Sequence, residues 1–171
     1  MIYKIIGGAI FLFSSIAFGM AGAMRIKKSL SQTEDLRNGL QYIKNDIHLR
    51  NSSIGNSIIN SSCVMVTELS KVFLAWGQAI NSRNGNSPKD VIAGLLYEDY
   101  ILLSTECKEL ILSWASQFGG GDKTTEGKEI EHIITQVDCI IEKQKDESDT
   151  KIKLYKTYGF MIGAIVLVVI L

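Results

Sequence analysis

Few residues of this chain could do chemistry, and they are widely spaced. The two histidines, His48 and His132, stand far apart, and neither belongs to the H-x-x-x-H grouping that holds a catalytic zinc ion. Two pairs of neighbouring carboxylates fit the first turn or the solvated face of a helix better than an acid–base site: Glu34/Asp35 and Glu98/Asp99. We therefore expect neither a metal site nor a catalytic site.

A run of three glycines, Gly119-Gly120-Gly121, has the composition of a phosphate-binding loop. Such a loop needs a preceding strand and the register G-x-x-x-x-G-K-[ST], and the sequence offers neither. Because glycine enters left-handed conformations cheaply, the run is expected to end a helix. The motifs G-x-G-x-x-G and G-x-S-x-G are also absent from the sequence. These observations predict a protein that is not an enzyme and has no cofactor or small-molecule substrate.

The composition suits one helical domain between two apolar ends. The 171 residues are 46% hydrophobic and 21% charged, with a formal net charge of zero, and no basic patch with interleaved aromatic residues predicts nucleic-acid binding. A single proline and the absence of alternating Val, Ile or Thr runs predict an all-α middle. The three cysteines are Cys63, Cys107 and Cys139, and no two of them form a C-x-x-C pair. An odd number of widely spaced cysteines predicts buried free thiols in a reducing compartment.

The two ends of the chain are uncharged and apolar. Ile5 to Met24 is long enough, at about 30 Å as a helix, to cross a bilayer. The run from Thr157 to Leu171 is about 22 Å long, which is marginal unless Leu154 and Tyr155 extend it while Lys156 reaches the headgroups. We expect a membrane helix in residues 1–24, a helical bundle in 25–150 and a second membrane helix in 154–171.

Lysines and arginines predict which side of the membrane the middle faces. Six of them flank the middle directly: Arg25, Lys27, Lys28, Lys151, Lys153 and Lys156. At the opposite ends of the apolar segments there are only Lys4 and the terminal amine. Basic residues beside membrane segments favour the cytoplasmic side, so the bundle is expected in the cytoplasm with both termini across the membrane. The alternative is an exported helical domain released by signal-peptide cleavage after Ala23, since Ala21-Gly22-Ala23 has the small-x-small form of a cleavage site.

Small residues recur at helical spacing in both apolar ends. Ser15, Gly19 and Ala23 repeat every fourth position, and Gly159 and Gly163 form a G-x-x-x-G motif. Small side chains let helix backbones approach closely in lipid, where no hydrophobic effect drives association. The two ends are expected to pack through these residues, either on each other or on the helices of a partner.

Apolar stripes predict the helices of the middle. Leu36, Leu40, Ile43 and Ile47 share one face of a helix that runs on from the first apolar segment, and the residues between them, through Asp46, form a solvated face. Further helices are expected after Ser53, from about Val64, and after the Ser87-Pro88-Lys89-Asp90 capping box; the helix from about Val64 carries the stripe Leu69/Phe73/Trp76/Ile80. Two later helices are expected over the stripes Leu103/Cys107/Leu110/Trp114 and Ile130/Ile133/Ile134/Val137/Ile140/Ile141.

Two polar segments interrupt this pattern. Asn81 to Ser87 is expected to be a loop, and the last helix is expected to begin near Thr124 or Thr125. Glu142 to Lys151 has ten polar residues in a row, so no apolar stripe could hold it against a core. It is expected to be a solvated stalk, a frayed linker or a surface for a polar partner.

The order and spacing of these features resemble the stage III sporulation protein AB family of endospore-forming bacteria over essentially the whole chain. The resemblance lies in a lysine-led, glycine-rich first span, then in the motif residues of the bundle and of the last span: Leu36-Arg37-x-x-Leu40-x-x-Ile43-x-x-Asp46-Ile47, Phe118-Gly119, Asp122-x-x-x-Glu126 and Lys156-x-x-Gly159-x-x-x-Gly163. The chain departs from the family at Ser52-Ser53-Ile54, in the length of the segment before Asp122, and at Glu126.

The resemblance implies an antiparallel bundle of about six helices, similar to the GspF-like domains of secretion and pilus platforms, with a transmembrane helix at each terminus. It also implies a non-enzymatic scaffold that couples a cytosolic secretion-type ATPase, similar to stage III sporulation protein AA, to other subunits of a channel between mother cell and forespore. The location that it implies is the mother-cell-derived membrane around the forespore.

Overall fold

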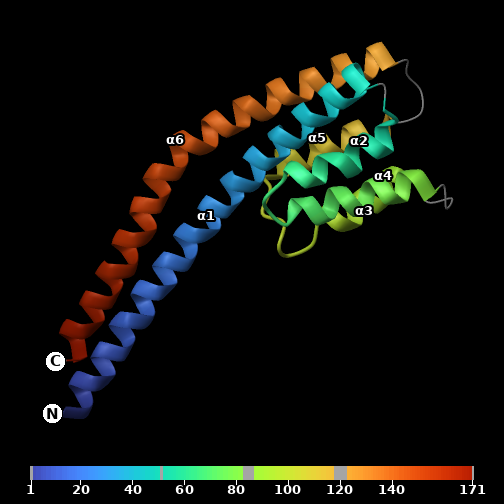
Figure 1. Ribbon diagram of the computed structural model, residues 1–171. Helices are drawn as coiled ribbons and strands as arrows, with labels where there is room; N and C mark the ends of the chain where they lie inside the picture. The colour runs from blue at the N-terminus through green and yellow to red at the C-terminus, as the bar shows by residue number, and fades with distance from the viewer. Residues whose placement is uncertain (1, 51, 83–86, 118–122, 171) are drawn as a thin grey trace. The chain divides into compact units, whose positions relative to one another are not determined.

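The computed structural model describes residues 2–50, 52–82, 87–117 and 123–170. Within these residues the chain is all-α, with six α-helices, a short 3-10 turn (Ser62–Val64) and no strand (Figure 1). The helices are α1 (Ile2–Arg50), α2 (Ile54–Ser61), α3 (Leu69–Ser82), α4 (Pro88–Leu96), α5 (Thr105–Ser116) and α6 (Lys123–Ile170). The prediction of an all-α chain is confirmed.

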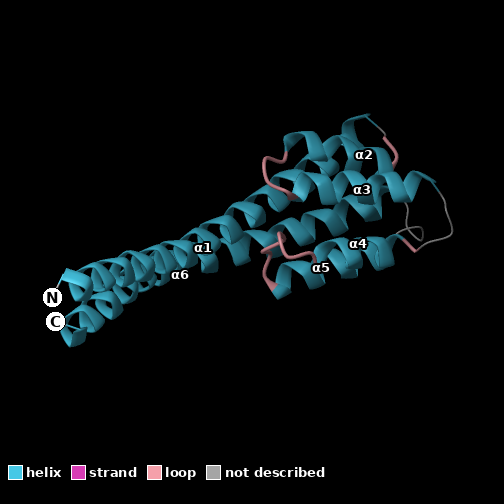
Figure 2. Ribbon diagram, turned by 90° about the horizontal axis from the view of Figure 1, so that it is seen from below, coloured by secondary structure: helices cyan, strands magenta, loops and turns pink. Residues whose placement is uncertain are grey.

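The chain divides into two compact units. The terminal unit combines Met1–Lys28 with Lys143–Leu171, and the central unit is Ser29–Glu142. In the terminal unit the helical residues of α1 and α6 lie side by side (Figures 1 and 2). In the central unit the four short helices pack in sequence order, with α2 against α3, α3 against α4 and α4 against α5.

The predicted apolar stripes form the core of the central unit. All four stripe residues of α1 are buried, as are all six on α6. Leu69, Phe73 and Trp76 are buried on α3, while Ile80 packs against this core from its edge. Leu103 and Cys107 are buried beside Trp114, although Leu103 lies just before α5. The periodicity thus identified the core side chains correctly because burial needs one continuous helix face.

Two tryptophans occupy the centre of this core. The rings of Trp76 and Trp114 meet edge to face with centroids 5.5 Å apart, and Phe73 packs edge-on against Trp76 at 5.7 Å. The indole N–H of Trp76 donates to the carbonyl of Pro88 over 3.0 Å. A buried indole needs such a partner, so this bond fixes the start of α4 against α3.

The start of α3 was predicted too early. The helix begins at Leu69, not near Val64, and the backbone at Met65 is extended. A carboxylate on α1 holds this extended segment in place: Asp35 accepts the backbone N–H groups of Val66 and Thr67.

The remaining boundaries lie close to the predictions. Ser53 and Ser87 precede α2 and α4 as expected, although neither side chain makes a capping bond. The helix α3 extends through Ser82 into the predicted loop, whose residues 83–86 lie outside the described residues, as does Gly119-Gly120-Gly121. The polar stretch from Glu142 to Lys151 is helical throughout, as part of α6.

Candidate functional site

The terminal unit contains a seam of small residues between α1 and α6. The hydroxyl of Ser15 donates to the carbonyl oxygen of Gly159 over 2.6 Å. Gly19, Ala23, Gly159 and Gly163 are all buried. We call these five residues the seam; they are the small residues selected from the sequence, and the contacts below join α1 to α6.

The glycines of the seam let the two backbones touch. A Cβ atom placed on Gly19 would lie 2.7 Å from the carbonyl oxygen of Tyr155 and 3.3 Å from the Cα of Gly159. A Cβ on Gly159 would lie 2.9 Å from the carbonyl oxygen of Ser15. These neighbours are backbone atoms that cannot rotate away, so no larger side chain fits at either position without separating the helices.

Large apolar side chains point away from the seam. Phe13 is 73% exposed and Phe18 is 81% exposed on α1. On α6, the exposed residues include Tyr158, Phe160 and Ile165. The terminal unit therefore has small residues inside and large apolar residues outside, the reverse of a water-soluble helix pair. Across the described residues, we find no helix with a segment both long and apolar enough to span a bilayer.

The basic residues selected from the sequence lie in the terminal unit, beside the seam. Arg25, Lys27 and Lys153 are exposed. Lys151 is exposed too and pairs with Glu147 one turn earlier on α6. The hydrogen bond and charge of Lys151 lower the pKa of the Glu147 carboxyl.

Two further basic residues differ from these. Lys28 is half-buried and has an interaction partner. The side chain of Lys156 lies outside the described residues.

In the central unit, α1 holds the connecting loops with buried polar side chains. Gln32 is fully buried; its amide donates to the carbonyl of Tyr100 over 2.9 Å, and its side-chain oxygen accepts the N–H of Leu102 over 2.6 Å. Ser29 donates to the carbonyl of Leu102 over 2.6 Å. These bonds satisfy the backbone of the loop between α4 and α5, which forms no helix of its own.

Two carboxylates of α1 that were expected on a solvated surface are buried instead. Asp35 holds the segment before α3, as described above, and Asp46 accepts the Ser57 hydroxyl of α2 over 2.9 Å. Burial by itself would raise the pKa of Asp46, but hydrogen bonds from Ser57, Ser52 and Asn60, together with the charge of Arg50, outweigh it and lower the pKa. Sequence reasoning missed these contacts because an Asp next to an apolar stripe has the same local sequence whether its carboxylate is solvated or hydrogen-bonded.

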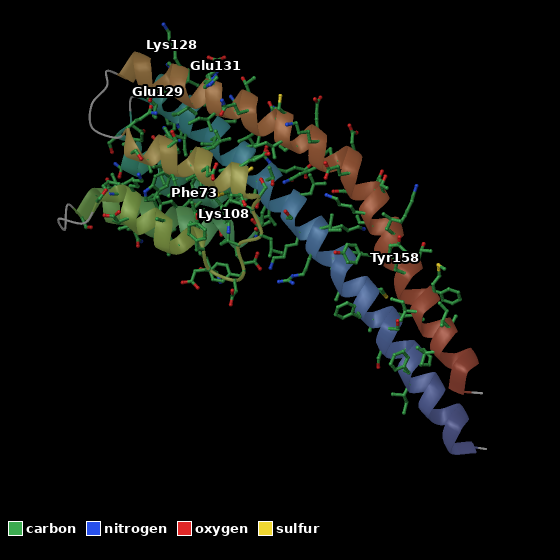
Figure 3. All side chains as sticks on the ribbon, turned by 180° about the vertical axis from the view of Figure 1, so that it is seen from behind. Phe73, Lys108, Lys128, Glu129, Glu131 and Tyr158 are labelled. Atoms are coloured by element: carbon green, nitrogen blue, oxygen red, sulfur yellow. The ribbon has the colours of Figure 1, made fainter. Side chains whose placement is uncertain are left out.

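Ion pairs join α1 to α6 within the central unit. Arg37 lies 3.0 Å from Asp138, and Lys44 lies 3.1 Å from Glu131. Lys128, Glu129 and Glu131 are on the first turns of α6 (Figure 3). Partly exposed ion pairs of this kind contribute about 0–1 kcal/mol each to the stability of the fold. Their main effect is on how α1 and α6 are aligned along each other.

A groove of about 520 Å³ lies between α5 and the start of α6. Its apolar side comes from Leu110, Trp114 and Ile133, and its polar side includes Glu129 and His132. His132 bonds to Gln136 on the next turn at 2.9 Å, so its ring is held on α6. Among the described residues, no three His, Cys, Asp or Glu side chains are grouped closely enough to hold a metal ion.

All three cysteines are free thiols. Cys107 is buried as predicted, and burial raises the pKa of its thiol. The prediction of burial was wrong for Cys63 and Cys139, which are exposed. Cys63 lies in the 3-10 turn, where no stripe constrains its direction, and Cys139 lies on the outer side of α6 between the buried positions Val137 and Ile140.

Comparison with known proteins supplies one match. A model of the stage III sporulation protein AB family matches residues 4–171. No curated protein and no solved structure matches significantly. Since the match covers both units and all six helices of the described chain, this protein belongs to the stage III sporulation protein AB family and has a role in sporulation.

Proposed function

We propose that this protein is a non-enzymatic, membrane-anchored scaffold of a sporulation complex. Residues 1–24 and 154–171 lie in the membrane as two packed helices, and the central unit lies in the cytoplasm together with the polar stretch of α6. There the central unit couples a secretion-type ATPase to the membrane machinery. The location is the mother-cell-derived membrane around the forespore.

The packing of the terminal unit carries this proposal. Ser15 and Gly159 bring the helices into backbone contact, while Phe13, Phe18 and Phe160 face outward. Apolar side chains that stay exposed to water cost roughly 25 cal/mol of free energy per Å² of surface, and surrounding lipid removes that cost. Close packing of small residues is the interaction that remains available to helices in lipid.

Charge supports the sidedness. Arg25 and Lys27 on α1 and Lys153 on α6 are exposed, and in the sequence they lie between the apolar run that ends at Met24 and the one that begins at Thr157. Translocating them would oppose the positive-inside preference at both ends of the central unit. The alternative, cleavage after Ala23, would cut inside continuous helix at a buried residue. An intact mass that includes Met1 supports the anchored form, and a mature chain that starts at Met24 contradicts it.

The helical polar stretch is our first candidate for the ATPase surface. Glu142, Asp146 and Asp149 are exposed on α6, and no apolar stripe commits this segment to a core. The loop Asn81–Ser87 is the second candidate. Charged surfaces of this kind guide association and set specificity more than they add affinity.

The test is co-purification of the full chain in detergent with the ATPase of the same organism, with and without nucleotide. We expect the ATPase to be retained, and to be lost from Asp146→Lys/Asp149→Lys. The matched control is Asp90→Lys/Glu109→Lys, which reverses two exposed acids on α4 and α5. Failure of the parent chain to retain the ATPase in either nucleotide state contradicts the coupling role.

A further inference from the structure

Two loops of the central unit carry apolar side chains that stand in solvent. Val66, in the loop before α3, is 92% exposed, and Val64 is exposed beside it. Tyr97 is 64% exposed and Tyr100 is also exposed, both in the loop between α4 and α5. We call these four residues the loop patch. Aromatic side chains of this kind are enriched at protein interfaces.

The loop patch is held in place by α1. Asp35 accepts the N–H of Val66 itself over 2.8 Å, and Gln32 binds the carbonyl of Tyr100 over 2.9 Å. Gln32 also donates to Glu68 at 3.4 Å, so a single buried side chain contacts both loops. The two loops that carry the exposed side chains are therefore held by the same helix, which lowers the entropy cost of binding a partner.

Charge indicates what this surface binds. Glu98 and Asp99 lie between the two tyrosines and are exposed, and the ammonium of Lys108 lies 5.0 Å from the centroid of the Tyr97 ring. Two carboxylates against this one ammonium leave the surface acidic, and anionic lipid, which attracts basic segments, repels it. It fits instead a protein surface in which lysine or arginine stands next to apolar side chains.

The terminal unit presents a surface of that composition. Met24, Arg25 and Lys27 are exposed on α1, and Lys153 and Leu154 are exposed on α6. We call these five residues the collar. The two helices meet here, since a Cβ on Gly22 would lie 2.6 Å from the ring of Tyr155.

We propose that the loop patch of one copy docks on the collar of a neighbouring copy. This inference rests on the proposed function, because a shared membrane holds all copies at one level. The contact joins two different surfaces, so its repetition generates a ring or a row of copies.

The test is mixed cross-linking of full chains reconstituted in one vesicle. All carry Cys63→Ser and Cys139→Ser, which leaves only the buried Cys107; one chain has Tyr100→Cys and the other Lys27→Cys. We expect cross-linked dimers from the mixture and none from either variant alone. Adding Glu98→Lys/Asp99→Lys lowers the cross-linked fraction roughly ten-fold, whereas the control Asp90→Lys/Glu109→Lys does not change it.

Three results overturn this inference. Absence of dimers from the mixture removes the contact, and dimers from Tyr100→Cys alone indicate a symmetric interface. A polarity-sensitive dye on Tyr100→Cys that reports lipid indicates contact with the bilayer instead. Maleimide labelling of Cys139 in the parent chain reports separately on which side of the membrane the central unit lies. If Cys139 is cytoplasmic but no mixed dimers form, this inference is wrong and the proposed function is unaffected.

Discussion

Ser15 and Gly159 are joined by a 2.6 Å hydrogen bond although 144 positions separate them in the chain. The bond links the first helix to the last, and Gly19 lies against the same point of α6. The small residues were expected to pack either on each other or on the helices of a second protein. In the structure, Ser15 and Gly19 contact α6 of the same chain.

Enlarging the seam is expected to separate the two helices. Gly159→Leu places atoms against the backbone of Ser15 and Gly19 and lowers the stability of the terminal unit by about 1–3 kcal/mol. The measurement is the distance between spin labels that replace the exposed Phe13 and Tyr158, in a chain with Cys63 and Cys139 changed to Ser. The control is Gly7→Leu on α1, where nothing lies within 4 Å of an added Cβ.

We expect a longer and broader distance for Gly159→Leu, an unchanged one for Gly7→Leu, and unchanged near-ultraviolet circular dichroism from the tryptophans of the central unit. Gly163→Leu should act as Gly159→Leu does, because Gly163 is also buried. The same distance in both seam variants as in the parent would show that the seam does not hold the helices together.

Loss of the Gln32 amide is expected to loosen the central unit. Gln32→Ala leaves the N–H of Leu102 and the carbonyl of Tyr100 without their bonds, which lowers the free energy of unfolding by about 2–3 kcal/mol. Denaturant titration followed by tryptophan fluorescence measures it. Asn38→Ala, at an exposed position of the same helix, should stay within about 0.5 kcal/mol of the parent. Equal effects of the two substitutions would rule out the role given to Gln32.

Asp46 makes the stability of the central unit depend on pH. Its pKa is lower in the folded chain than in the unfolded one, so the carboxylate stabilises the fold above its ordinary value of 3.8. That stabilisation is lost as the pH falls through the lowered folded-state pKa. Stability curves at pH 6 and below should therefore fall less steeply for Asp46→Asn than for the parent. Parallel curves would show that Asp46 does not titrate differently on folding.

The helices and the core could be predicted from the sequence because both depend on local spacing. Leu36, Leu40, Ile43 and Ile47 repeat at the helical period, and such a face has no stable arrangement except burial. The buried polar contacts could not be predicted in the same way. Gln32 bonds to residues 68 and 70 positions away, and nothing in its local sequence distinguishes it from a solvated glutamine.

For the candidate site, the small residues of the seam could be selected from the sequence alone. The residues that they contact could not. Spacing puts Ser15, Gly19 and Ala23 on one face without saying which helix lies against it. The error at the start of α3 has a related cause: Asp35 is 31 positions before Val66, whose N–H it binds. Long-range bonds of this kind override local helix preference.

Thiol reactivity should separate the three cysteines. Burial raises the pKa of Cys107 and hides its sulfur, so the thiolate that reacts is scarce at neutral pH. A chromogenic disulfide reagent should modify two thiols rapidly and the third only after denaturant is added. Cys107→Ala should remove the slow phase and keep the fast ones. Three equally fast thiols would show that the core around Cys107 is open.

The sidedness of the central unit tests the whole account most directly. Cys139 is exposed on α6 and needs no engineering, so a membrane-impermeant maleimide can report its location in sporulating cells. The account predicts no modification of Cys139 while the plasma membrane of the mother cell is intact and full modification once that membrane is permeabilised. Modification of Cys139 in intact cells, or no modification after permeabilisation, would place the central unit away from any cytosolic ATPase and would contradict the proposed role.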